Sequence, residues 1–118
     1  MVASPVLARD KRALKLRSEI DVELLAFAER YATNLARWDL LVYFGRNPST
    51  RGTARDIAVE IGRRPRIVQK ELDDLTYLGI LRARENCHGR RYEMVRAPRT
   101  RQMIKRFAQR HIDGNGQD

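Results

Sequence analysis

The stretch from Thr53 to Gly79 constrains the fold of this chain more than any other, because it predicts two short helices joined by a tight turn. Thr53 and Asp56 form the Thr-x-x-Asp capping pair of a helix start. Gly62 ends this first helix after about nine residues, and Pro65 suits the first turn of a second helix. The residues expected to face inward recur at helical spacing: Ile57, Ala58 and Ile61 in the first helix, and Val68, Leu72, Leu75 and Leu78 in the second.

A predicted β-hairpin follows the second helix. Ile80–Glu85 and Arg91–Val95 read as short strands. The residues between them, Asn86–Arg90, include Asn and Gly and are expected to form the turn. Two short helices followed by a hairpin are the elements of a helix-turn-helix unit with a wing.

Further helices are predicted on both sides of this unit. Val6 to about Asn34 lacks Gly and Pro and predicts one long helix, or two helices that break near Ser18. Leu35–Arg46 predicts another helix, which the following Asn-Pro pair ends. Pro98–Ile112 predicts a basic helix, and Asp113–Asp118 is expected to fray. The expected inward residues are Leu35, Trp38, Leu41 and Val42 in the middle helix, and Met103, Ile104, Phe107 and Ala108 in the last one.

Positive charge is concentrated in two parts of the chain. The 118 residues carry 24 Lys and Arg against 15 Asp and Glu, a formal charge of +9, and 20 of the cations are Arg. Residues 46–70 hold seven cations and two acids, and residues 96–118 hold six cations and two acids. Because the planar fork of Arg suits phosphate and guanine edges, this clustering points to a polyanionic partner, most simply nucleic acid. A merely solvated surface is the alternative.

The helices and hairpin carry a family resemblance. The stretch Thr53–Gly62, the pattern Val68-x-x-x-Leu72-x-x-Leu75-x-x-x-Gly79-Ile80-Leu81, and Arg91–Met94 resemble the winged helix-turn-helix of bacterial transcription regulators of the MarR and ArsR types. The resemblance implies an α+β, mostly α fold, a winged helix-turn-helix with additional N- and C-terminal helices. We expect an N-terminal helical extension over 1–34, the winged helix-turn-helix domain over 35–96, and a basic C-terminal helix and tail over 97–118.

The resemblance also implies which residues contact DNA. The helix at about 65–78 would be the recognition helix, whose first turns enter the major groove. There Arg66 would pair with guanine, Gln69 would read adenine, and Lys70 would hold a phosphate or a base edge. Arg63 and Arg64, in the turn, would meet phosphates.

Two features depart from the family pattern. The family usually has Ser or Thr ahead of the recognition helix, whereas this chain has Arg64-Pro65, so the helix start lacks a side-chain cap. Its amide groups could take a phosphate instead. Many relatives have basic residues where this chain has Asp73 and Asp74. We expect Asp74 to pair with Lys70 one turn earlier, and Asp73 to point toward the duplex and repel it.

The wing at about 84–91 offers Arg84, His88, Arg90 and Arg91 for contact with the minor groove or the DNA backbone, unless it is an ordinary basic hairpin. Cys87 beside His88 supplies at most two metal ligands, and the recognition helix lacks the Cys-x-Cys of metal-sensing ArsR-type regulators. We therefore expect no metal and no cofactor.

The expected function is that of a sequence-specific DNA-binding transcription regulator, with double-stranded DNA as its partner. Two alternatives stay open. One is a general nucleic-acid binder that relies on the basic tail, and the other is a winged-helix protein-interaction module in which Asp73 and Asp74 belong to the interface. An enzyme is not expected, because the sequence has neither a Gly-rich phosphate loop nor a candidate catalytic triad.

Apolar residues in the terminal helices would be exposed unless they pack on the core or on a second subunit. They are Leu24, Phe27 and Tyr31 near one end and Met103, Ile104 and Phe107 near the other. We expect a homodimer through these helices, the alternative being a monomer whose terminal helices fold back. The longest apolar run is far short of the roughly 20 residues that span a membrane, and no secretory signal is evident, so a cytoplasmic protein without membrane contact is expected.

Overall fold

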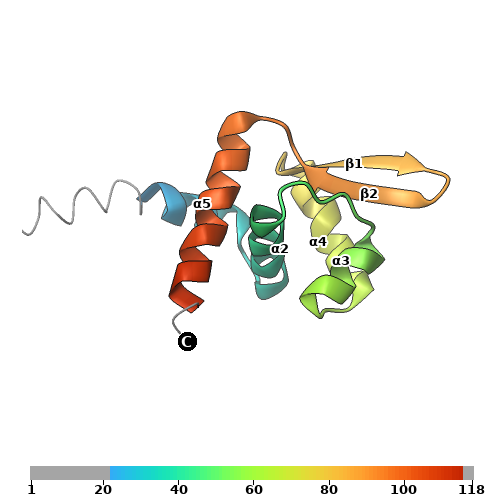
Figure 1. Ribbon diagram of the computed structural model, residues 1–118, viewed down its shortest axis with the longest axis horizontal. Coiled ribbons are helices and arrows are strands. Elements are labelled where there is room, and N and C mark those ends of the chain that lie inside the picture. Colours follow the sequence, from blue (N-terminus) through green and yellow to red (C-terminus); the bar gives the residue numbers. More distant parts are fainter. Residues whose placement is uncertain (1–21, 116–118) are drawn as a thin grey trace, which may run out of the picture.

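Figure 1 shows a computed structural model of the chain, in which a group of helices carries a two-stranded hairpin that projects at one end. The structure describes residues 22–115, with side chains through residue 110. The helix predicted before residue 22, its break near Ser18, and the last tail residues, 116–118, lie outside this range. The described elements are a helical segment over 22–31, α2 (Leu35–Arg46), α3 (Ala54–Ile61), α4 (Pro65–Tyr77), β1 (Leu81–Asn86), β2 (Gly89–Met94) and α5 (Pro98–Asn115).

The mostly helical α+β fold predicted from the sequence is confirmed. Helices α2, α3 and α4 lie within one residue of their predicted bounds. Helix α5 continues through Asn115, so its expected end at Ile112 is wrong.

Helix α2 is buried on a different face from the one predicted. Its buried residues are Ala36, Leu40, Leu41 and Phe44. Leu35 was expected inward but is 73% exposed. Because successive helix residues are about 100° apart, Leu35 lies nearly opposite the buried stripe. Trp38 and Val42 are partly buried against the core.

Helix α5 crosses α2 on the side away from α3 and α4 (Figure 1), and it packs mainly on α2. The rings of Trp38 and Phe107 are 5.0 Å apart, and those of Phe27 and Phe107 are 5.6 Å apart. Leu24 and Ile104 are buried in the same region. These apolar residues of the terminal helices pack within a single chain, so they do not by themselves require a second subunit.

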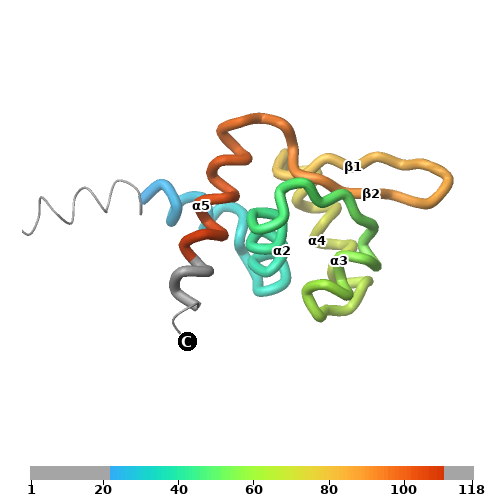
Figure 2. Tube along the Cα trace, in the orientation of Figure 1, coloured from blue at the N-terminus to red at the C-terminus, as the bar shows by residue number. Residues whose placement is uncertain are grey.

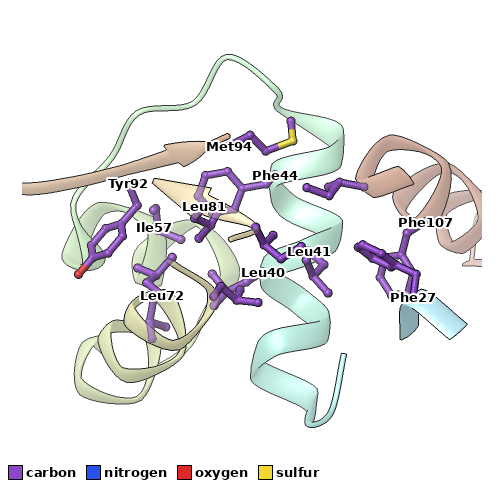
Figure 3. Close-up of a cluster of buried hydrophobic side chains, with 14 of the residues drawn as sticks. Phe27, Leu40, Leu41, Phe44, Ile57, Leu72, Leu81, Tyr92, Met94 and Phe107 are labelled. Atoms are coloured by element: carbon purple, nitrogen blue, oxygen red, sulfur yellow. The ribbon is translucent and has the colours of Figure 1, made fainter. Parts of the chain in front are cut away.

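The hydrophobic core is one cluster that extends from the helical segment 22–31 to the wing (Figure 3). Phe27 and Phe107 lie on one side of α2, whereas Ile57, Leu72 and Tyr92 lie on the other. Helix α2 thus joins the terminal helices to the unit formed by α3, α4 and the hairpin.

The hairpin is longer and its turn tighter than predicted. β1 and β2 are antiparallel, and their register pairs Leu81 with Met94 and Asn86 with Gly89. The predicted five-residue loop is therefore wrong, since only Cys87 and His88 lie between the strands. Two local features permit this turn: the Asn86 side chain accepts a hydrogen bond of 2.8 Å from the His88 amide, and Gly89 has a φ of 113°.

The loop between α2 and α3 adds a third backbone segment to the hairpin. Figure 2 shows this loop running past β2 before it enters α3. Gly52 and Tyr92 exchange two backbone hydrogen bonds, of 3.2 and 2.8 Å. This bridge places the residues that flank Gly52 beside the wing.

Candidate nucleic-acid interface

Helices α3 and α4 meet in the predicted turn. The Thr53 hydroxyl accepts a hydrogen bond of 3.1 Å from the Asp56 amide and caps α3. Gly62 turns the chain with a φ of 71°, a left-handed conformation that glycine adopts without a steric penalty. Within the described chain, no side chain caps the start of α4, where Pro65 is the first helical residue. The first-turn amides of α4 therefore lack a side-chain acceptor, and they point out of the N-terminal end of the helix.

Helix α4 presents polar residues on the face opposite its buried stripe. Val68, Leu72 and Leu75 are 0% exposed. With about 100° between successive residues, Arg66 and Lys70 lie on the opposite side of the helix, and Gln69 lies at the edge of that side. All three side chains are exposed. The structure thus brings these three predicted contact residues onto one accessible face.

The two arginines of the turn differ in their surroundings. Arg64 is exposed. Arg63 donates a hydrogen bond of 2.6 Å from its Nε to the Asp39 carboxylate, and only 33% of its side chain is exposed. Arg63 therefore ties the turn to α2, and its charge already has a partner.

The predicted pair of Lys70 and Asp74 is confirmed, with 2.9 Å between Lys70 Nζ and Asp74 Oδ2. The hydrogen bond with Asp74, together with the charges of Glu71 and Asp74, raises the pKa of Lys70. The same hydrogen bond lowers the pKa of Asp74. Both groups are charged at neutral pH, so they form an ion pair on the surface of α4.

A buried carboxylate, Glu71, links α4 to α2. Glu71 is 6% exposed. Its Oε1 accepts hydrogen bonds of 2.9 and 2.8 Å from Nε and Nη2 of Arg37, and its Oε2 accepts one of 3.1 Å from Asn34. Arg37 also donates to Asp74 at 3.1 Å. A single arginine of α2 thus binds two acids of α4, which Lys70 also contacts, and ties that helix to α2.

The pair of Arg37 and Glu71 was not predicted from the sequence, because the two residues are 34 positions apart. One signal was present. Glu71 falls between Val68 and Leu72 on the inward side of α4, and a carboxylate at an apolar position usually has a cationic partner.

The sequence predicts that Asp73 points toward the duplex and repels it, whereas in the structure the wing holds this carboxylate. The Tyr92 hydroxyl donates a hydrogen bond of 2.5 Å to Asp73 Oδ1, and Arg90 Nε lies 3.5 Å from the same oxygen. The Arg90 guanidinium also lies 5.6 Å from the centre of the Tyr92 ring. Burial and the hydrogen bond with Asp73 raise the pKa of Tyr92 to about 12.

The predicted wing residues do not form one surface. Arg90 faces α4, because it contacts Asp73. Arg84 and Arg91 are directly opposite each other in the strand register, so both lie on the other face of the hairpin. His88 is exposed in the turn at the tip. Of these four residues, Arg90 is the one that contacts α4.

Among the described residues, no group of three or more His, Cys, Asp and Glu side chains could hold a metal ion. Within that range, too, no helix is long and apolar enough to cross a membrane. Cys87 is an exposed thiol at the tip of the wing.

Comparison with known proteins found no matching family model and no matching curated protein. Solved structures do match. The antimony-specific transcriptional repressor AntR is 21% identical, with a TM-score of 0.60 over 100% of this chain and 90% of AntR. MarR from Oenococcus oeni is 14% identical, with a TM-score of 0.57 over 90% of this chain and 80% of that one. YusO from Bacillus subtilis is 13% identical, with a TM-score of 0.54 over 98% and 84%. Together with the α3–turn–α4 unit and its hairpin, these likenesses show that the chain has the winged-helix fold of MarR-type regulators.

Proposed function

We propose that this protein is a cytoplasmic, sequence-specific DNA-binding transcription regulator. The observation that supports this most is the exposed face of α4, where Arg66, Gln69 and Lys70 lie opposite the buried stripe near an uncapped helix start. A helix presented in this way fits the major groove of DNA. The names of the structural neighbours support the same function, because AntR is described as a transcriptional repressor and MarR as a transcription regulator.

Each polar residue of α4 has a proposed role. Arg66 pairs with a guanine edge and Gln69 with an adenine edge, and each contact discriminates against a wrong base by about 1–3 kcal/mol. Lys70 exchanges its ion pair with Asp74 for a DNA phosphate. Arg64 and the first-turn amides of α4 hold a second phosphate.

The wing contacts DNA next to α4. Arg90 reaches the minor groove or the backbone from the face of the hairpin that contacts α4, and His88 reaches it from the exposed tip. Arg90 then exchanges Asp73 for DNA, as Lys70 exchanges Asp74. The proposed activity is binding, with no catalytic step.

We also propose a homodimer through the terminal helices. Val22 is 61% exposed and Leu25 is 58% exposed, although both lie in a helical segment whose Leu24 and Phe27 are buried. A second copy that covers these side chains would place two α4 helices about 34 Å apart, one turn of DNA, and would select a palindromic site.

The test is a selection from random duplex DNA at about physiological salt. We expect an enriched palindrome, and we expect Arg66→Ala/Gln69→Ala to lose the sequence preference while weak general binding remains. The matched control is Lys105→Ala/Gln109→Ala, which removes one cation and one amide from the exposed side of α5 and should keep the preference.

Two results would contradict the proposal, and each favours an alternative. Salt-dependent binding without any enriched sequence would indicate a general nucleic-acid binder. Failure of this basic chain to shift any duplex even at low salt would indicate a protein-interaction module.

A further inference from the structure

The face of the wing that points away from α4 carries arginines in a regular arrangement. We call it the outer face, because Leu81, Tyr92 and Met94 are buried on the other side. The register places Arg82 opposite Glu93, and Arg84 opposite Arg91. The bridge between Gly52 and Tyr92 places Arg51 beside Glu93, on the edge of β2 that faces away from β1. The outer-face residues are Arg51, Arg82, Arg84, Arg91 and Glu93.

The charges on the outer face do not balance. Glu93 Oε1 lies 3.1 Å from Arg51 Nε, and its Oε2 lies 3.3 Å from Arg82 and 3.7 Å from Arg84. Each guanidinium has five N–H donors, whereas one carboxylate accepts about four hydrogen bonds. Most donors of these arginines therefore remain available after Glu93 has been satisfied.

Arg91 increases the imbalance. Among the described residues it has no ion-pair partner, and it is directly opposite Arg84. Like charges at directly opposite positions of a sheet destabilise it. A bound anion between the two side chains would turn this repulsion into attraction.

A hollow lies where these donors converge. Its volume is about 200 Å³, and it is lined by Arg51, Arg84, Asn86, Arg91, Tyr92 and Glu93. Since a water molecule takes about 30 Å³ in the liquid, the hollow has room for one phosphate group and a few waters. The fork of Arg matches the oxygens of such a group.

We propose that this hollow is a binding site for a phosphate group, held by Arg51, Arg84 and Arg91. The phosphate comes either from a DNA backbone or from a small phosphate-bearing molecule. The phosphate site itself does not require that the protein bind DNA. The assignment of its phosphate to a DNA backbone, in contrast, rests on the proposed function. Arg90 takes no part, because it faces α4.

The first experiment tests the site without DNA. Inorganic phosphate and pyrophosphate are titrated into the full chain, with chloride adjusted to keep the ionic strength constant, while NMR follows the Arg Nε–H groups. We expect saturable shifts at Arg51, Arg84 and Arg91 that Arg84→Ala/Arg91→Ala abolishes. Both side chains are exposed, so their truncation leaves the core intact. The control Lys105→Ala/Arg106→Ala removes the same number of charges from α5 and should keep the shifts.

The second experiment identifies the source. Duplexes that the protein binds are made with one uncharged methylphosphonate at each backbone position in turn. If the DNA backbone is the source, a methylphosphonate at one position should weaken DNA binding by the natural chain about tenfold. The same methylphosphonate should not weaken binding by Arg84→Ala/Arg91→Ala. Saturable phosphate binding without this effect would assign the site to a small molecule. Absence of both effects would overturn the proposal, and it would leave the role of α4 unaffected.

Discussion

The Tyr92 hydroxyl donates a 2.5 Å hydrogen bond to the Asp73 carboxylate and so joins β2 to α4. Tyr92 is 1% exposed, and its ring extends from β2 toward the helices, with the oxygen at the edge of the core (Figure 3). Arg90 lies against both partners. Asp73 therefore joins the wing to α4 in addition to the hydrophobic core that the two elements share.

Tyr92→Phe should destabilise the fold without opening a cavity. The ring remains, but Asp73 loses a hydrogen bond, and hydrogen bonds to charged groups contribute about 1.5–3 kcal/mol. We expect the free energy of unfolding to fall by about that amount in urea denaturation, with an unchanged m-value. An unchanged midpoint would mean that the hydroxyl bond contributes nothing to stability.

The phenol of Tyr92 should titrate above the usual pH range of a tyrosine. Burial and Asp73 raise its pKa from 10.0 to about 12 in the folded state. Between these pH values the folded chain keeps a proton that the unfolded chain loses. The resulting stabilisation is complete below pH 10 and is lost as the pH rises through about 12. Absorbance at 295 nm should show a late phenol that Tyr92→Phe removes; its persistence in the variant would assign it to another tyrosine.

Local sequence signals predicted most of the fold. The Thr53 cap, the Gly62 turn and the proline at the start of α4 each act within a few residues, so the bounds of α3 and α4 follow from the sequence. The buried face of α2 was predicted wrongly because α2 packs on two sides, against α4 and against α5, and a single apolar stripe cannot represent both contacts.

The candidate site was predictable only in part. Helical spacing correctly placed Arg66, Gln69 and Lys70 on the accessible side of α4. The division of the wing into two faces depends on the strand register, because a shift of one residue would move each side chain to the opposite face. The placement of Arg51 beside Glu93 depends on the bridge at Gly52, a contact between distant segments that leaves no local pattern.

Gly45→Ala should destabilise the chain although alanine favours helices. A Cβ at this position of α2 would overlap the Ala108 side chain and lie 2.7 Å from the Ile104 carbonyl oxygen. Overpacking of this kind costs about 1–3 kcal/mol, against roughly 1 kcal/mol gained by replacing a helical glycine. We expect a lower thermal midpoint for Gly45→Ala. Adding Ala108→Gly to Gly45→Ala should lower the midpoint by less than Ala108→Gly lowers it in the natural chain. A raised midpoint would show that α5 shifts away from α2 without penalty.

Arg37→Ala should be the most damaging of these substitutions, because Glu71, which is 6% exposed, loses the arginine that donates two hydrogen bonds to it and keeps only Lys70, at 3.9 Å, as a cationic partner. Removing one partner of a buried ion pair costs about 3–5 kcal/mol. Replacing both partners by apolar residues of similar size is often neutral, so Arg37→Met/Glu71→Met should recover most of the loss in urea denaturation.

The double variant also separates stability from DNA affinity. Without Arg37, Asp74 keeps only Lys70 as a cationic partner among the described residues, and Lys70 is the residue that we expect to reach a phosphate. Because the double variant also removes Glu71, the net charge beside α4 does not change; if the Arg37–Asp74 contact instead leaves Lys70 available for a phosphate, Arg37→Met/Glu71→Met should bind DNA more weakly than the natural chain at equal stability. Equal affinity of the two chains would limit Arg37 to a role in folding.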